Sequence, residues 1–439
     1  MRNTTITEKP KRGLRTSSTF RALNHRNYRI WFIGQTISLI GTWMQTMAQQ
    51  VLVYSLTGSA AALGLINFVA LIPLVPLSLW GGSLVDRVSK RRVIVTTQSI
   101  MLIQALVLAG LTISGRVQIW HVFVLAFILG SATAVDLPAR QAFTVEMVEG
   151  KDDLMNAIAL NSAMFNMARA VGPAMAGVIV AATGEGIAFL LNAFTFLAVI
   201  VSLALMRNLP RPEYHAAVAS DVRMHMGQGI RFVRGQQNIL VIISVVAVSA
   251  FLSMPYSTLM PVFAEEILFK SAQPVVGLIC GLNNARCVSP EALPLGLLMA
   301  AVGIGAVAGA LYIASLHTNA RRGLMLTIGT IGFPAVLLLF STSRSFLLSL
   351  GLLLVMGFVF TWQNALANTL LQVASPDEMR GRVMSYYTMT TQVAMRLGGL
   401  QAGFMADWMG AAFSLGIGAV ISLVYGLIIA TRFPGIRKL

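Results

Sequence analysis

The chain has 439 residues, of which 56% are hydrophobic and 11% are charged, and its mean hydropathy is +0.75. A soluble protein carries about 25% charged residues, so this composition excludes an ordinary soluble domain and indicates a protein embedded in a membrane. The net charge of +16 would suggest nucleic acid as the partner of a soluble protein. Here the positions of the basic residues argue against that partner.

Residues 1–27 are polar and basic, and they lack the short apolar core and small-residue cleavage site of a signal peptide. We expect residues 1–19 to form a disordered basic tail in the cytoplasm. After this tail, about twelve runs reach the length of about 20 mostly apolar residues that a helix needs to cross a bilayer. The predicted spans are 28–56, 60–84, 93–114, 118–137, 156–182, 186–206, 239–262, 293–316, 323–342, 346–372, 384–408 and 411–432.

The basic residues lie mainly on one side of the predicted membrane. With the N-terminus in the cytoplasm, only six of the 32 Lys and Arg residues fall outside the cytoplasmic segments. Four of them are in exterior loops (Arg116, Lys270, Arg286 and Arg344) and two are inside predicted helices (Arg169 and Arg396). Cytoplasmic enrichment of Lys and Arg sets membrane topology, so we predict an inner-membrane protein with both termini in the cytoplasm.

A long polar segment, 207–238, divides the chain into two halves. It contains an amphipathic stretch that we expect to lie along the membrane surface. A glycine-rich run follows a short acidic loop in each half, with Gly172-Pro173 in the first and Gly398-Gly399 in the second. Parallel six-helix repeats are typical of transporters. We therefore predict an all-α membrane protein of twelve transmembrane helices in two pseudo-symmetric six-helix bundles, 20–206 and 239–439.

Both cysteines, Cys280 and Cys287, lie in the longest exterior loop, 263–292. They are close in sequence and on the oxidising side of the membrane, so a small disulfide loop is one expectation. Two free thiols are the alternative.

A cluster of acidic and basic residues lies in the loop between the second and third predicted helices. Charges at the end of an apolar helix mark a short cytoplasmic loop, and glycine lets two helices approach closely. The run 82–92 contains Gly82, Leu84, Asp86, Arg87, Lys90 and Arg91. At these positions it resembles the loop between helices 2 and 3 of major facilitator superfamily transporters, with Ser89 replacing the usual second glycine. The resemblance implies the major facilitator fold and a latch between the cytoplasmic ends of the halves; a solvated loop that only sets topology is the alternative. The expected latch residues are Gly82, Asp86, Arg87, Lys90, Arg91 and, at the end of helix 4, Asp136.

Helix 5 carries a second motif. Gly172, Pro173 and Gly177 resemble the helix 5 signature of antiporters of this superfamily, while alanine stands at the other three glycine positions. Alanine still permits close helix packing. The segment is therefore either an antiporter-like motif or a kinked packing helix.

Arg169 and Arg396 are the cations that the predicted spans place inside the membrane. Such a cation costs at least about 2.5–3.5 kcal/mol, so it normally faces a partner or a water-filled cavity. No acid lies mid-helix near either residue in the sequence, which leaves room for an anionic substrate as partner, above all at Arg396. Pairing with Asp136 or with helix-end carbonyl groups is the alternative, above all for Arg169. The expected substrate cavity residues are Gln35, Gln45, Gln49, Arg169, Asn364 and Arg396. Asp136 is also the candidate for proton coupling, because it is the one acid predicted near a cavity helix within the bilayer.

The runs 136–141, 161–169, 368–372 and 376–385 are similar to the branch of the superfamily that includes the enterobactin exporter and other transmembrane secretion effectors. The resemblance implies efflux of a small amphipathic molecule, such as a siderophore or drug, by proton antiport with alternating access. A lysophospholipid flippase of the same fold and a non-transporting membrane sensor or scaffold are the alternatives.

The sequence contains no nucleotide-binding loop, metal-ligand cluster or catalytic triad. We therefore expect no enzymatic activity, no cofactor and no metal. The expected partners are a small-molecule substrate, protons and the lipid bilayer, with the protein acting as a monomer.

Overall fold

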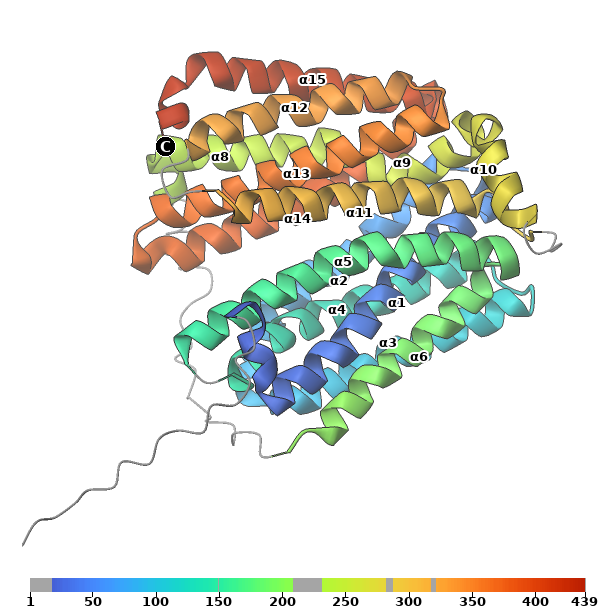
Figure 1. The fold of residues 1–439 in the computed structure, drawn as a ribbon, viewed down its shortest axis with the longest axis horizontal. Coiled ribbons are helices and arrows are strands. Elements are labelled where there is room, and N and C mark those ends of the chain that lie inside the picture. The colour runs from blue at the N-terminus through green and yellow to red at the C-terminus, as the bar shows by residue number, and fades with distance from the viewer. Residues whose placement is uncertain (1–17, 149, 208–230, 282–286, 317–320, 439) are drawn as a thin grey trace, which may run out of the picture.

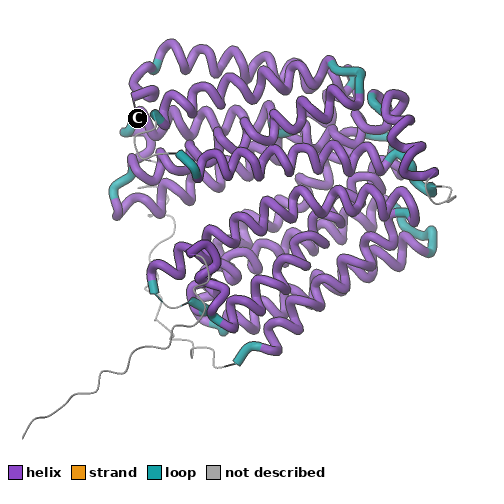
Figure 2. The backbone as a smooth tube through the Cα atoms, in the orientation of Figure 1, coloured by secondary structure: helices purple, strands orange, loops and turns teal. Residues whose placement is uncertain are grey.

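The computed structural model describes residues 18–148, 150–207, 231–281, 287–316 and 321–438. Within these ranges every regular element is a helix and no strand occurs (Figures 1 and 2). A helix satisfies its backbone hydrogen bonds internally, which an apolar chain needs when lipid replaces water. The fold is therefore all-α, as the composition predicted.

A first group of helices lies in the lower half of Figure 1. Its helices follow one another through short turns, and Gly58 and Gly184 have positive φ at the turns after α1 and α5. Glycine fits these positions because it has no Cβ atom. The elements are η1 (Ser18–Asn24), α1 (Arg26–Thr57), α2 (Ala60–Arg87), α3 (Lys90–Ile113), α4 (Ile119–Glu146), α5 (Lys151–Thr183) and α6 (Glu185–Leu205).

A second group lies in the upper half of Figure 1 and ends near the C-terminus. Phe333 and Phe340 of α12 are fully buried in this group, against the rings of Tyr256 and Phe263. The elements are α8 (Gln237–Val248), η2 (Ser249–Ser253), α9 (Tyr256–Val262), η3 (Phe263–Ile267), α10 (Phe269–Gly281), α11 (Ala292–Ala314), α12 (Arg322–Thr342), α13 (Phe346–Ala374), α14 (Asp377–Met409), α15 (Ala411–Arg432) and η4 (Pro434–Lys438).

Nine helices in the described part of the chain are long and apolar enough to cross a membrane. The predicted spans 28–56, 60–84 and 384–408 are not among them. In α2 the apolar helix that qualifies is the shorter segment Ala60–Leu74. In α1 and α14 polar side chains lower the hydropathy, and these two helices supply Gln50 and Arg396 to the contacts between the groups.

The seventh predicted span, 239–262, differs from the structure in a second way. It extends to Ile267 and is interrupted by two π-helical turns, η2 and η3. Pro255 and Pro261 lie between these turns and lack the N–H that would continue the helical hydrogen bonds. Because π-helical turns often occur at functional sites, the break makes this part of the second group a candidate for one.

The two ends of the molecule are distinct, and we name them by their contents. The disulfide end, on the right of Figure 1, carries α10 and the loops 114–118 and 343–345. The opposite end carries η1 and η4 and is called the terminal end.

Small residues hold the two groups together along two pairs of helices, α5 with α11 and α2 with α14. On the first pair, a Cβ atom added to Gly303 would lie 2.4 Å from Cα of Ala170. On the second pair, a Cβ atom added to Gly403 would lie 2.5 Å from the carbonyl oxygen of Ala60. Such distances mean direct backbone contact, which is how helices associate where lipid offers little hydrophobic driving force.

Candidate functional site

Two arginines reach across the interface between the groups. From α5, Arg169 donates a hydrogen bond through Nη2 to Oγ1 of Thr361 on α13, at 3.4 Å. From α14, Arg396 donates through Nη1 to the carbonyl oxygen of Asn67 on α2, at 2.9 Å. Each group of helices thus sends one guanidinium into the other.

Both guanidinium groups keep unused donor capacity. The Nε atoms of Arg169 and Arg396 are buried and have no hydrogen-bond partner among the described residues. The ion pairs found in the described part of the chain involve neither arginine. The indole Nε1 of Trp362, next to Thr361 in sequence, is a third buried donor without a described partner. An unsatisfied buried donor is costly, so each of these groups favours a hydrogen-bond acceptor beside it.

The broken seventh span borders the same interface. Pro261 cannot donate to the carbonyl oxygen of Ser257 four residues earlier, and Nε2 of Gln50 on α1 donates to that oxygen at 3.4 Å instead. In the π-helical turn η2, the hydroxyl of Ser249 accepts a hydrogen bond from Nε2 of Gln363 at 2.9 Å. The hydroxyl of Ser253 in the same turn is buried without a described partner. Gln50 of the first group therefore compensates for a backbone hydrogen bond that the second group lacks.

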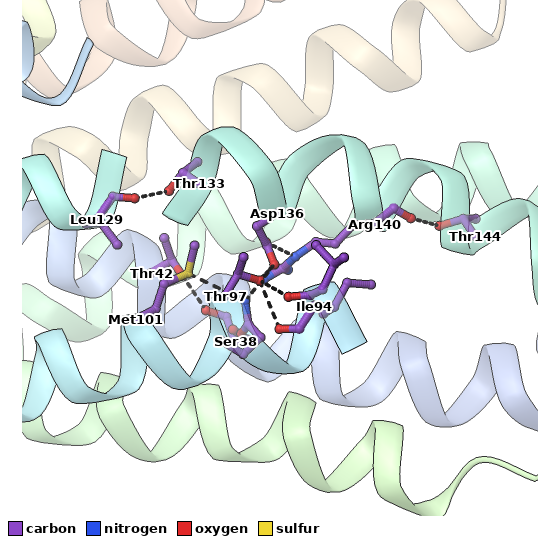
Figure 3. A network of polar contacts seen from close by, with 12 residues as sticks. Ser38, Thr42, Ile94, Thr97, Met101, Leu129, Thr133, Asp136, Arg140 and Thr144 are labelled. Atoms are coloured by element: carbon purple, nitrogen blue, oxygen red, sulfur yellow. Dashed lines mark hydrogen bonds and ion pairs between the residues drawn. The ribbon is translucent and has the colours of Figure 1, made fainter. Parts of the chain in front are cut away.

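Asp136 lies in a buried polar network inside the first group (Figure 3). It is 4% exposed and forms an ion pair through Oδ2 with Nε of Arg140, one turn later on α4. Its Oδ1 accepts hydrogen bonds from Oγ1 of Thr97 at 2.6 Å and from Nε2 of Gln98 at 3.2 Å, both on α3. The carboxylate is thus fully engaged, by Arg140 and α3 and not by Arg169 or Arg396.

The predicted cavity amides have separate surroundings. Gln45 lies between α1, α3 and α6: its Oε1 accepts from Nδ2 of Asn192 at 2.5 Å and its Nε2 donates to Oε1 of Gln104 at 3.2 Å. Asn364 donates to the carbonyl oxygen of Phe360 in its own helix. Gln35 is buried with Oε1 unpartnered among the described residues, and Gln49 is half-buried. Of the predicted cavity residues, Arg169 and Arg396 therefore have described hydrogen bonds to the other group, each at a different helix. Gln50, which was not among the predicted residues, also contacts the other group.

The expected latch is described only in part. The side chains of Gly82, Asp86 and Arg87 lie outside the described residues, although α2 continues through Arg87. Lys90, in the first turn of α3, forms an ion pair with Glu146 at the end of α4. Arg91 follows it and is half-buried. Lys90 thus joins two helices of one group in this conformation.

The helix 5 motif packs on both sides of α5. A Cβ atom on Gly172 would lie 2.6 Å from Cβ of Trp43 on α1, and one on Gly177 would lie 3.0 Å from Cα of Gly296 on α11. A Cβ atom on Gly296 would in turn lie 2.6 Å from the carbonyl oxygen of Pro173. The motif therefore lets α5 touch α1 within its own group and α11 in the other.

The disulfide end holds further contacts between the groups. Cys280 and Cys287 form a disulfide, and the backbone N–H of Val288 beside it donates to the carbonyl oxygen of Ala181 at 2.7 Å. Tyr54 on α1 donates to Oε1 of Glu266 in η3 at 2.5 Å. The sequence alone does not distinguish Tyr54 or Glu266, because acids and tyrosines near helix ends are common; only their contact across 212 positions marks them.

The described residues contain no group of three or more His, Cys, Asp or Glu side chains that could hold a metal ion. The side chains that donate hydrogen bonds across the interface include Arg169, Arg396 and Gln50.

The family model of transmembrane secretion effectors matches residues 17–437. The chain is 26% identical over 272 residues to the staphyloferrin A transporter of Staphylococcus aureus, covering 60% of this chain and 67% of that protein. It is 24% identical over 425 residues to the enterobactin exporter EntS of Escherichia coli, covering 94% of each.

Solved transporter structures share the fold. A bacterial homologue of the human lysosomal transporter Spinster, in an inward-facing, unoccupied conformation, aligns with a TM-score of 0.67 at 11% identity and covers 96% of this chain and 98% of that one. A POT family transporter in complex with 5-aminolevulinic acid aligns with a TM-score of 0.71 at 12% identity, covering 94% and 96%. The resemblance to the major facilitator superfamily is therefore confirmed, and the chain belongs to the transmembrane secretion effector family of transporters.

Proposed function

We propose that the protein exports a small, amphipathic, anionic molecule of the siderophore type by alternating access, and that Arg169 and Arg396 bind the anion. The observation that carries the proposal is that both arginines cross the interface without a described acidic partner and keep a free Nε. A charge-assisted hydrogen bond contributes about 1.5–3 kcal/mol, so carboxylate or catecholate oxygens would bind well there. The relatives named as a staphyloferrin A transporter and an enterobactin exporter support this substrate class.

The proposed topology has twelve spans in two six-helix bundles, 20–206 and 239–439, with the segment 207–238 and both termini in the cytoplasm of an inner-membrane monomer. In this topology the disulfide end is exterior. The direct contacts of α5 with α11 and of α2 with α14 then close the exterior side. The inward-facing conformation of a structural neighbour supports the same assignment. The latch of Asp86, Arg87 and Arg91 would form in the opposite state.

Proton antiport would need a carboxylate whose protonation changes with the conformation, and Asp136 remains our candidate. Its ion pair with Arg140 and its hydrogen bonds from Thr97 and Gln98 join α4 to α3. Protonation would neutralise one partner of the pair and release Arg140 from it. The link between Asp136 and α3 would then depend on the hydrogen bonds from Thr97 and Gln98 alone.

Asp136→Asn tests this role. The amide keeps an acceptor for Thr97 but leaves Arg140, whose side chain is 15% exposed, without its counter-charge. Removing one partner of a buried ion pair costs about 3–5 kcal/mol, which is the upper bound here. We expect a clearly lower melting temperature and loss of protonophore-sensitive export. The double variant Asp136→Asn with Arg140→Gln should regain stability, because no unpaired charge remains, but not coupled export. Unchanged export in Asp136→Asn would contradict the coupling role.

A lysophospholipid flippase is the second candidate, and a lateral groove favours it. The groove lies between α3 and α4, has a volume of about 490 Å³ and is lined mainly by apolar residues, with Arg92 among them. An acyl chain could lie along it, with the headgroup phosphate near Arg92.

Efflux from energised cells decides between these candidates. Cells would be loaded with a catecholate siderophore, an anionic dye, a cationic dye or a labelled lysophospholipid, with and without a protonophore. Protonophore-sensitive export of the siderophore or anionic dye is expected. Export of the lysophospholipid alone would favour the flippase, and no export across this panel would favour the sensor or scaffold.

A further inference from the structure

A carboxylate at the end of α14 binds the beginning of α2 in the other group. Asp407 accepts hydrogen bonds at Oδ1 from the backbone N–H of Ala60 at 2.6 Å and at Oδ2 from the backbone N–H of Ala61 at 3.1 Å. The hydroxyl of Ser59 also donates to Oδ2, at 2.5 Å. Between 346 and 348 positions separate the partners in sequence.

These are the contacts of a helix N-cap, supplied by a different helix. The first N–H groups of a helix have no partner within it and carry partial positive charge. In α2 the Ser59 hydroxyl accepts from the N–H of Ala62 at 3.3 Å, so Ser59 and Asp407 together satisfy the first turn. Because Asp407 belongs to α14, the cap is complete only when α14 touches α2.

The helix packing next to this cap also requires α14 and α2 to be in direct contact. A Cβ atom on Gly403, one turn before Asp407, would lie 2.5 Å from the carbonyl oxygen of Ala60, and one on Gly64 would lie 2.6 Å from that of Gly399. No side chain separates the helices here. Movement of α14 away from α2 at this end would therefore break all three hydrogen bonds to Asp407.

We propose that Asp407 is a latch of the disulfide end: it stabilises the conformation in which that end is closed and is released when the end opens. This proposal rests on the alternating access proposed above. Asp407 lies at the opposite end of the molecule from Asp86 of the expected cytoplasmic latch.

The distance between the groups at the disulfide end tests the latch without any transport measurement. Spin labels would be attached to Ser114→Cys in the loop after α3 and Arg344→Cys in the loop after α12, both exposed. The native cysteines are bonded to each other, so they do not compete for label. Pulsed electron paramagnetic resonance on purified protein in nanodiscs would give the distance distribution.

Asp407→Ala is expected to raise the ratio of long to short distances about fivefold, since losing an N-cap carboxylate costs about 1 kcal/mol. Asp407→Asn, which keeps one acceptor, should give a smaller rise. Asp377→Asn is the matched control, because Asp377 pairs with Arg380 inside α14 and should leave the distribution unchanged.

An Asp407→Ala distribution identical to that of the parent would overturn the latch, and so would an equal shift in Asp377→Asn. Size-exclusion profiles of all variants show whether each is folded, and Asp407→Asn remains available if the alanine variant is not. A shift with Asp407→Ala in a protein that exports nothing would contradict the proposed function and leave the latch standing.

Discussion

Arg396→Gln is expected to reduce export of an anionic substrate about tenfold to a hundredfold while leaving the fold intact. Glutamine can still donate to the carbonyl oxygen of Asn67, which Arg396 contacts at 2.9 Å, but it carries no charge. A charge-assisted hydrogen bond contributes about 1.5–3 kcal/mol, and each 1.4 kcal/mol is about tenfold in affinity. The measurement is the concentration dependence of export into inverted membrane vesicles.

The conservative variant separates charge from contact. Arg396→Lys keeps the positive charge and should retain most export of the anion, although it loses the planar donor pair. Arg169→Gln should show a similar loss, since the two arginines have equivalent positions in the two groups. If Arg396→Gln exports the anion as well as the parent does, Arg396 is only a contact between the groups and the anion proposal is wrong.

Gly303→Ala should change the conformation and Gly305→Ala should change the stability, although these glycines lie two residues apart on α11. A Cβ atom on Gly303 would lie 2.4 Å from Cα of Ala170 in the first group, whereas one on Gly305 would lie 1.9 Å from the carbonyl oxygen of Leu354 in the second group. Overpacking costs about 1–3 kcal/mol. In Gly303→Ala this cost falls on the closed interface, and in Gly305→Ala it falls on the fold of one group.

We therefore expect Gly303→Ala to raise the ratio of long to short spin-label distances at the disulfide end about tenfold. Its melting temperature should change little. Gly305→Ala should lower the melting temperature and leave the distances unchanged. Gly351→Ala is the control, because a Cβ atom there would meet nothing within 4 Å. Equal distance shifts in Gly303→Ala and Gly305→Ala would show that the interface at α5 and α11 does not control opening.

These variants address different parts of one cycle. Arg169 and Arg396 concern what is bound, Asp136 concerns coupling, and Gly303 and Asp407 concern which side is open. Because the last two are measured by distance alone, a failure to find the substrate does not prevent their test.

The amino-acid sequence by itself determined the all-helical class, the family and several of the residues to examine. Lipid leaves an apolar chain few structures other than helices, so composition was sufficient for the class. The cost of a cation in a predicted span selected Arg169 and Arg396 before any contact was known. The glycines of helix 5 were likewise visible as packing positions, although not the helices they contact.

Tertiary structure alone decided which polar residues of a helix face the other group. Gln45 and Gln50 are five residues apart on α1, and so about 140° apart around a helix with 3.6 residues per turn. Gln45 binds Gln104 and Asn192 within its own group. Gln50 donates to the carbonyl oxygen of Ser257 in the other group. Hydropathy does not specify how a helix is rotated about its axis when polar residues occur on several faces. For the same reason Asp407, an ordinary acid near a helix end, could be recognised only from its contact with a helix about 350 positions earlier.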